Sequence, residues 1–290
     1  MISYRSYLKS RFGGRVLKVP VNAGFSCPNR DGAKSVSGCV FCDNRAFSPV
    51  HDNNLPPADQ LRRGIDGCGG RYDFFLPYLQ PFSNTYAPVD KLKSVYESLL
   101  SVDKRVIGLA VGTRPDCIDE SVYGYLGDLN KRAYVSVELG LQSGHDSVLE
   151  RMNRGHTVRD FTDAVYRLDG IDVETVAHII LGFPGETAEM AEQTAVMLSG
   201  LPVRGVKVHQ LMVVEGTELA RAFAAGELEE MTLEGYAGLL VRFIARLRPD
   251  QHIHRIMADS KPEYGLVAPA WSAKKTEAMN YLSAKIAKFC

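Results

Sequence analysis

Residues 24–44 read GFSCPNRDGAKSVSGCVFCDN and hold three of the six cysteines of the chain, Cys27, Cys39 and Cys42. Eleven residues separate the first two, the last two form a CxxC pair, and no further cysteine lies nearby. A structural zinc site is normally closed by four ligands. An iron–sulfur cube held by three thiolates instead leaves one iron open to a small molecule, so this loop predicts a [4Fe–4S] cluster of the open kind.

Two other uses of the cysteines have to be compared with this one. A zinc site with three cysteines and His51 is an alternative on spacing alone. A disulfide framework is disfavoured, because six cysteines in 290 residues without a signal peptide indicate a reducing compartment, which we expect to be the cytoplasm. Cys68, Cys117 and Cys290 lie far apart and are expected to be ordinary thiols.

The composition is that of a globular protein, with 45% hydrophobic and 23% charged residues. No apolar run approaches the roughly 20 residues that a membrane-spanning helix needs, so no membrane partner is expected. Thirty-four basic and 34 acidic side chains give no overall electrostatic attraction for nucleic acid, although a neutral protein can still carry a local basic face.

On both sides of the cysteine loop, β-rich runs alternate with helical patterns, which is typical of βαβ units around a parallel sheet. Six such units predict an α/β fold, a partial (β/α)6 TIM-like barrel, over residues 1–215. Residues 216–290 are interpreted as a C-terminal extension of helices and a short strand, packed on the open edge of the barrel. The six predicted strands are Arg15–Pro20, Phe74–Pro81, Arg105–Val111, Tyr134–Leu139, Glu174–Leu181 and Val206–Val213.

Parallel barrels carry their chemistry on loops at the carboxyl ends of the strands, and the cysteine loop follows the first predicted strand. Polar residues at other strand ends are therefore candidates for the same site. Glu138 and Gln142 fall near the end of the fourth predicted strand, and Gln80 and Asn84 follow the second, where their oxygens could accept hydrogen bonds from an ammonium group. The structural alternatives are a solvated strand end for the first pair and a plain turn for the second.

The cysteine loop is part of an ordered series of motifs: AGFSCPNRDG at 23–32, SGCVFC at 37–42, ELGLQS at 138–143, RGHT at 154–157 and LGFPGET at 181–187. Together they resemble the radical S-adenosylmethionine (SAM) enzymes. Within these the chain is most similar to the YhcC-like group, near the catalytic subunit of Elongator and the oxygen-independent coproporphyrinogen oxidases. Two departures are a cysteine spacing longer than the C-x3-C-x2-C of many members, and LQPFSNTYAP at 79–88 in place of their Gly-Gly-Glu run.

The resemblance implies roles for particular residues. It makes the three cysteines of the loop the cluster ligands, assigns Gln142 to the ribose of SAM and Arg154 to its methionine carboxylate, and places the turn with Gly182 and Pro184 beside the adenine. Arginine suits a carboxylate because its planar fork donates two parallel hydrogen bonds. Arg154 could otherwise be a surface cation at a helix end.

The implied activity is reductive cleavage of SAM to methionine and a 5′-deoxyadenosyl radical, with an electron from a donor such as flavodoxin or ferredoxin. Relatives by motif that alter the tRNA wobble uridine make modified tRNA the expected substrate. A small metabolite, porphyrin-type or other, and a zinc-binding regulatory module are the alternatives. From position 255 onward the tail contains six basic and three acidic residues. Its candidate substrate contacts are Arg255, Asp259, Trp271, Lys274 and Lys275.

Overall fold

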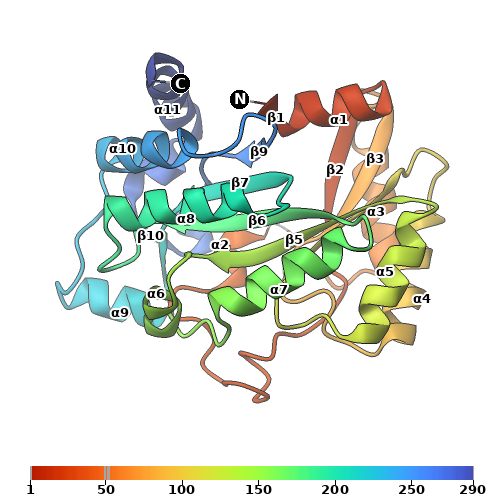
Figure 1. Ribbon diagram of the computed structural model, residues 1–290, viewed down its shortest axis with the longest axis horizontal. Helices are drawn as coiled ribbons and strands as arrows, with labels where there is room; N and C mark the ends of the chain where they lie inside the picture. Colours follow the sequence, from red (N-terminus) through yellow and green to blue (C-terminus); the bar gives the residue numbers. More distant parts are fainter. Residues whose placement is uncertain (1, 49, 51–52, 290) are drawn as a thin grey trace.

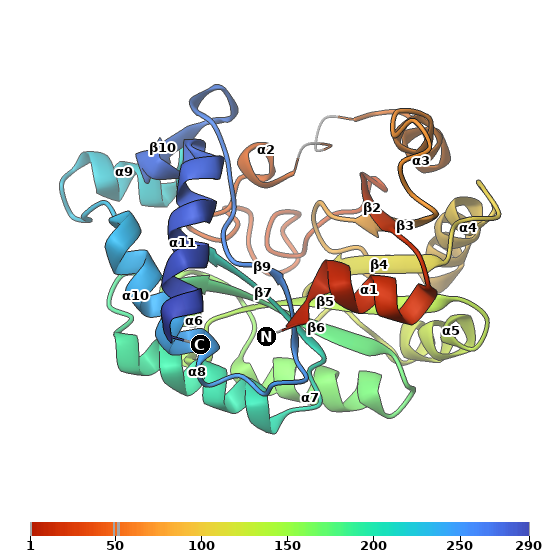
Figure 2. The ribbon, with the colours of Figure 1, turned by 90° about the horizontal axis from the view of Figure 1, so that it is seen from above.

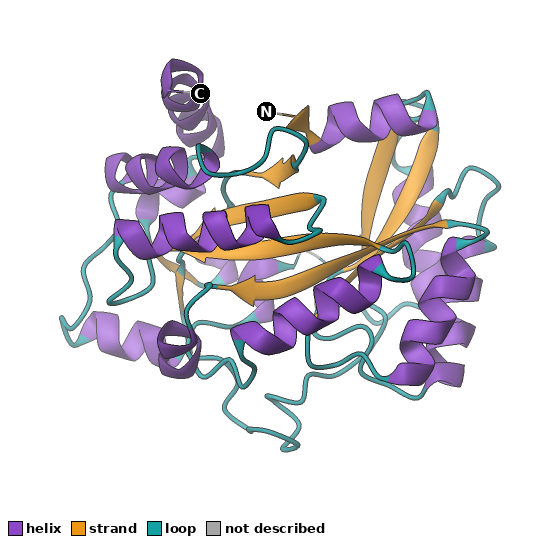
Figure 3. Cartoon of the chain, viewed as in Figure 1, coloured by secondary structure: helices purple, strands orange, loops and turns teal. Residues whose placement is uncertain are grey.

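The computed structural model describes residues 2–48, 50 and 53–289. His51 and Cys290 lie outside the described residues, so the zinc ligand proposed at His51 and the thiol at Cys290 stay predictions. The chain forms a parallel sheet that curls into a half-barrel, with helices on its outer side (Figures 1 and 2). Figure 3 shows the helices as a layer around the strands, with long loops between them.

Within the described ranges eight strands form the main sheet, and all neighbouring pairs in it are parallel. The strands in chain order are β1 (Ile2–Ser3), β2 (Val16–Val21), β3 (Phe74–Leu79), β4 (Gly108–Thr113), β5 (Tyr134–Gln142), β6 (Glu174–Leu181), β7 (Gly205–Gln210), β8 (Val213–Val214), β9 (His252–Arg255) and β10 (Leu266–Ala268). The order across the main sheet is β1-β9-β7-β6-β5-β4-β3-β2. Strands β8 and β10 form a separate antiparallel pair.

The helices follow the strands in the alternation that the sequence predicts. They are α1 (Tyr4–Phe12), α2 (Asn44–Phe47), α3 (Pro57–Asp66), α4 (Val89–Leu100), α5 (Glu120–Asn130), α6 (Asp146–Arg151), α7 (Val158–Asp169), α8 (Ala188–Gly200), α9 (Glu218–Ala224), α10 (Leu233–Ile244) and α11 (Lys275–Phe289), with 3-10 turns at Pro262–Tyr264 and Ala270–Ala273. Side-chain oxygens of Asp119, Thr157 and Thr187 cap α5, α7 and α8 by accepting from backbone N–H groups.

The predicted α/β partial barrel is confirmed, and the six predicted strands are present with small shifts at their ends. Strand β5 runs three residues beyond the predicted end, and the last predicted strand divides into β7 and β8. The main sheet also contains two strands beyond the six predicted. Strand β9, from the predicted C-terminal extension, pairs with β7, and the two-residue β1 pairs with β9.

The two faces of the curled sheet differ in chemistry. Along β5, Val137, Leu139 and Leu141 are buried in the hydrophobic core that lies under the outer helices. The alternate residues Glu138, Gly140 and Gln142 line a cavity on the inner side. Successive side chains of a strand point to opposite faces, so this alternation separates an apolar outer face from a polar inner one.

Helix α1 lies at the end of the barrel opposite the cysteine loop and contacts β2 and β9, near the two edges of the sheet (Figure 2). Its buried Tyr4 ring stacks on His254 of β9 with 3.6 Å between ring centroids. Lys18 of β2 lies over the same ring. Helix α1 therefore covers the amino-terminal end of the barrel interior. Within the described residues, no helix combines the length and the apolar character needed to cross a lipid bilayer.

The close approach of β4 to β5 gives a stability prediction. Gly108 faces Tyr134 in the strand register, and a Cβ at position 108 would lie 1.8 Å from the Tyr134 carbonyl oxygen. Gly108→Ala is therefore expected to lower the free energy of unfolding by about 3 kcal/mol, at the upper end for overpacking, as measured by urea denaturation. Gly124→Ala in α5 is the control, because a Cβ there meets nothing within 4 Å. An unchanged stability of Gly108→Ala would contradict the register of β4 against β5.

Candidate active site

A cavity that is partly open to solvent lies at the carboxyl ends of the strands. Its lining combines the cysteine loop with inward-facing residues of β3, β5, β6, β7 and β9. All three predicted cluster cysteines line this cavity. The predicted residues Gln80, Glu138, Gln142, Arg154 and Arg255 line it as well.

The cysteine loop has little regular structure and is held by other parts of the chain. The Asn153 side chain, just after α6, donates a hydrogen bond to the Gly38 carbonyl at 2.7 Å. The Val40 amide donates to the Met152 carbonyl at 3.2 Å. Within the loop, Arg30 donates to the Cys42 carbonyl. These contacts fix Cys39 and Cys42 against the end of α6.

The three cysteines share a cavity without converging on a single point. Among the described residues, no group of three or more His, Cys, Asp or Glu side chains is placed to hold one metal ion. A mononuclear zinc site would require such convergence, whereas the thiolates of a cube bind different irons at separate corners. Burial, followed by the neighbouring Cys39, raises the pKa of Cys42 to about 12.

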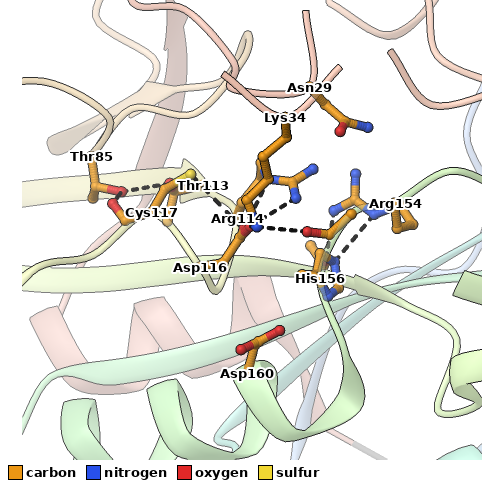
Figure 4. A network of polar contacts seen from close by, with 12 residues as sticks. Asn29, Lys34, Thr85, Thr113, Arg114, Asp116, Cys117, Arg154, His156 and Asp160 are labelled. Atoms are coloured by element: carbon orange, nitrogen blue, oxygen red, sulfur yellow. Dashed lines mark hydrogen bonds and ion pairs between the residues drawn. The ribbon is translucent and has the colours of Figure 1, made fainter. Parts of the chain in front are cut away.

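Arg154 lies in the cavity beside the cysteines and is only 7% exposed, so it is not a surface cation. Its guanidinium donates to the Gly140 carbonyl at 2.7 Å and to the Cys39 sulfur at 3.2 Å. Its third nitrogen lies 3.2 Å from His156, as Figure 4 shows. Burial and then the charges of Arg154 and Arg114 lower the pKa of His156 to about 3, so this imidazole is neutral near pH 7.

Gln142 and Gln80 approach the cavity from the ends of β5 and β3, the strands on either side of β4. Gln142 ends β5 with a positive φ of 78°, and its side-chain oxygen is buried without a hydrogen-bond partner among the described residues. Gln80, directly after β3, donates to the Phe47 carbonyl at 2.6 Å. An unpaired buried acceptor is costly, so the Gln142 oxygen marks a place where a ligand donor would be favourable.

Three predicted cofactor-binding residues lie outside the cavity lining. Asn84 is fully buried, and its amide nitrogen donates to the carbonyls of Leu79, Pro81 and Gly112 at 2.8–3.1 Å. This geometry fixes the turn after β3. Gly182 donates to the Glu186 carboxylate at 3.3 Å. The Pro184 carbonyl accepts a hydrogen bond from Arg151.

Four of the five substrate candidates also lie away from the cavity. Trp271 is half-buried, donates from its indole to the Met231 carbonyl at 2.8 Å and stacks on Tyr236, which is a packing role. Lys275 pairs with Asp259 at 2.9 Å. Lys274 lies 3.9 Å from Glu277. Only Arg255 of this set reaches the barrel interior.

The charged inner layer of the barrel was missed by sequence reasoning, apart from Glu138 and Arg255. The Glu138 side chain is fully buried and contacts Lys18 of β2, Lys207 of β7 at 2.9 Å and His178 of β6 at 2.6 Å. Lys207 also donates to the Tyr78 hydroxyl at 2.9 Å. The available signal was a lone polar residue in an otherwise apolar strand, such as Lys18 in VLKVPV.

A second buried network ties the cysteine loop to β4 (Figure 4). Arg114 donates two hydrogen bonds to Asp116, both at 2.9 Å. Lys34 of the cysteine loop pairs with the same carboxylate and donates to the Gly155 carbonyl at 2.7 Å. Burial alone would raise the pKa of Asp116, but its bonds to Arg114 and Lys34 outweigh burial and lower the pKa to about 2.

The fold and the cavity define a partial barrel of the radical SAM class, and comparison with protein families agrees. The radical SAM superfamily matches residues 26–198, and the radical SAM C-terminal domain matches residues 203–288. The chain therefore belongs to the radical SAM superfamily.

The relatives by sequence specify the group more narrowly. Protein YhcC of Escherichia coli (strain K12) is 35% identical over 275 residues, which covers 94% of this chain and 87% of YhcC. Protein YtqA of Bacillus subtilis (strain 168) is 33% identical over 286 residues, covering 97% of this chain and 87% of YtqA. A shorter match joins the chain to the tRNA uridine(34) acetyltransferase of Methanocaldococcus jannaschii, at 31% identity over 130 residues, 44% of this chain and 24% of that protein.

Solved structures share the fold at low identity. The Elp3 protein of Methanocaldococcus infernus superposes with a TM-score of 0.68 at 20% identity, covering 93% of this chain and 63% of its own. SuiB of Streptococcus suis, bound to S-adenosylmethionine, gives 0.55 at 11% identity, covering 89% of this chain and 54% of SuiB. TsrM of Kitasatospora setae, with cobalamin and a [4Fe–4S] cluster bound, gives 0.53 at 13% identity, covering 96% and 62%.

The Arg114–Asp116 pair gives a prediction with a defined pH dependence. The pKa of Asp116 is lowered from 3.8 to about 2, so the pair stabilises the fold fully above about pH 4 and loses this effect as pH falls toward 2. Asp116→Asn should therefore lower the free energy of unfolding by about 2 kcal/mol at pH 7, and by less at pH 3, in urea denaturation. Asp128→Asn, at an exposed ion pair, is the control and should leave the free energy of unfolding nearly unchanged. A loss that does not shrink at low pH would contradict the ionic origin.

Proposed function

We propose that this chain is an enzyme that holds a [4Fe–4S] cluster on Cys27, Cys39 and Cys42 and uses it to cleave SAM reductively. The observation that carries the proposal is the placement of these three cysteines, and of no other described cysteine, in one cavity of a radical SAM barrel. A cluster bound by three thiolates has an iron without a protein ligand, where a small molecule can bind.

The residues around the cysteines suit such a cluster. Asn29 and Arg154 both direct N–H groups at the Cys39 sulfur, at 3.4 and 3.2 Å. Hydrogen bonds and positive charge beside a ligating sulfur stabilise its negative charge and tune the reduction potential of a cluster. The chain thus provides the thiolates together with the groups that stabilise their charge.

The same cavity offers contacts for SAM. The unpaired Gln142 oxygen can accept from a ribose hydroxyl, and the Arg154 guanidinium supplies the positive charge that a carboxylate requires. When bound, the cluster and SAM supply the electron transfer and the 5′-deoxyadenosyl radical, with the electron coming from a donor such as flavodoxin or ferredoxin. The protein itself orients the cofactor and limits the access of water.

Iron content tests the proposal. Anaerobically reconstituted protein should contain about four irons per chain, and Cys39→Ala should lose the cluster and the ability to cleave SAM, because a cube on two thiolates is poorly held. Cys68→Ala is the matched control, since Cys68 is buried in the hydrophobic core away from the cavity, and it should keep its iron. A full cluster in Cys39→Ala would remove this residue from the ligand set.

Modification of the tRNA wobble uridine is one candidate for the reaction on substrate. It is supported by the partial match to the tRNA uridine(34) acetyltransferase and by the similarity of fold to Elp3. The charge of the tail gives it less support than the sequence suggested. Most of its cations lie within 4 Å of a carboxylate, at Lys261–Glu263, Lys274–Glu277, Lys275–Asp259 and Lys285–Glu234.

The tRNA candidate predicts a steep salt dependence. If the tail binds phosphates, the affinity for bulk tRNA should fall strongly between 50 and 200 mM salt, as expected for multiple ionic contacts. Replacing Lys274 and Lys275 together by alanine should then lower the salt slope by about two contacts. Filter binding at several salt concentrations measures the slope. A slope unaffected by the double variant would leave a small molecule as the substrate.

A further inference from the structure

The inner layer of the barrel contains more positive than negative charge. Glu138 is the only carboxylate among the described residues that line the cavity, whereas the lining includes five cationic side chains. Three of the five have partners in or beside the cysteine loop: Arg30 donates to the Cys42 carbonyl, Arg114 pairs with Asp116, and Arg154 contacts Cys39. Lys207 and Arg255 remain for the barrel interior.

Arg255 has no partner in the part of the chain that the structure describes. Among the described residues its guanidinium forms no hydrogen bond or ion pair; its Nε is buried, while the side chain as a whole is half-buried and lines the cavity. The nearest candidate along the chain, Asp259, pairs with Lys275. An arginine side chain stays charged, and a partly desolvated charge without a counter-charge is costly. An anionic group of a ligand would compensate it.

Lys207 lies next to Arg255 in the sheet, because β7 and β9 bring these two residues into register. It shares Glu138 with Lys18, so a single carboxylate faces two ammonium groups. Burial lowers the pKa of Lys207 to about 8 despite the adjacent Tyr78, and the charge of Arg255 acts in the same direction. The positive charge of the layer is thus undercompensated at both residues.

The histidines of the layer neither balance its positive charge nor add to it. His178 accompanies Lys207 in the sheet register, and His209 follows it two residues later on the same face. Burial, with the charge of Lys207 or Arg255, lowers the pKa of both imidazoles well below the usual value, so they are neutral. Neutral imidazoles can donate hydrogen bonds to a ligand without adding charge.

We propose that Arg255 and Lys207 bind a carboxylate or phosphate group of a small substrate inside the barrel. The substrate would lie between this inner layer and the cysteine loop, with its anionic group on the side away from the cysteines. Arginine suits the task because its fork can engage two oxygens of either group, while the lysine contributes a point charge. This inference names the substrate class for the radical chemistry proposed above, but the binding of the anion does not itself require the cluster.

The location favours a small molecule over tRNA. The layer lies at mid-strand on β5, β6 and β7, below the strand ends, and is reached through the cavity that the cysteine loop borders. One anionic group can enter such an interior, whereas a nucleic-acid backbone carries phosphates at every residue and binds along open basic surfaces. The paired lysines of the tail do not form such a surface.

Calorimetric titration with two probes tests the site on the full chain, namely inorganic phosphate and, separately, succinate. At least one probe should bind saturably, and Arg255→Met should raise its Kd by about tenfold or more, the effect expected from losing a charge-assisted hydrogen bond. Arg159→Met is the matched control, because Arg159 is 89% exposed on α7, and it should leave the Kd unchanged. The probe that binds identifies the anionic group as a phosphate or a carboxylate.

A second measurement keeps the inference testable if affinities are hard to compare. Without ligand, Arg255→Met should melt at a higher temperature than the wild type, because an unpaired and half-buried charge is removed. Saturating probe should raise the melting temperature of the wild type but not of this variant. An Arg255→Met protein that melts lower without ligand and keeps its response to the probe would overturn the inference.

Binding measurements on a cluster-free variant, and SAM binding by Arg255→Met, separate this inference from the proposed function. Cys39→Ala protein, without a cluster, should still bind the probe, so failure of the cluster prediction would leave the anion site standing. Arg255→Met should bind SAM as tightly as the wild type. A loss of SAM affinity equal to the loss of probe affinity would assign Arg255 to the methionine carboxylate and overturn the substrate site, as would wild-type protein that binds neither probe.

Discussion

The buried carboxylate of Glu138 holds together a barrel that its backbone leaves open. The sheet ends at β2 on one side and at β1 on the other, so no ladder of hydrogen bonds between described residues joins its two edges. Glu138, near the middle of the sheet on β5, contacts Lys18 on one edge strand and Lys207 toward the opposite edge. Lys207 in turn reaches Tyr78 on β3 across the interior. Side-chain contacts across the lumen thus supplement the missing backbone closure.

Strand positions and the cysteine loop were predictable because their signals are local. Continuous apolar runs such as GLAVGT in β4 arise from a parallel sheet buried on both faces, and the alternating helices follow from the crossover connections. Strand β9 was foreseen as a short strand, but its place beside β7 depends on long-range pairing that a single sequence does not encode in any local pattern.

The residues of the barrel interior were harder to predict, because their role depends on which of the two faces of each strand points into the barrel. Lys18 stands in a short apolar strand and Lys207 between two valines, and in neither case does the local sequence reveal whether the lysine points to solvent or to the lumen. Asn84 shows a related ambiguity. Backbone carbonyls in the turn after β3 accept from its amide nitrogen, whereas its buried side-chain oxygen, the atom expected to accept from a ligand, has no partner among the described residues. Local sequence does not separate these two cases.

The position of α1 has a kinetic consequence. This helix covers the amino-terminal end of the lumen, where Tyr4 stacks on His254, and no residue of α1 lines the cavity. The inner layer is then reached from the cysteine side, past the place where a cofactor would sit. A substrate that binds at the closed end of such a cavity must enter before the cofactor and leave after it. Turnover would therefore follow a compulsory order, because the bound cofactor would block the way out for the substrate beneath it.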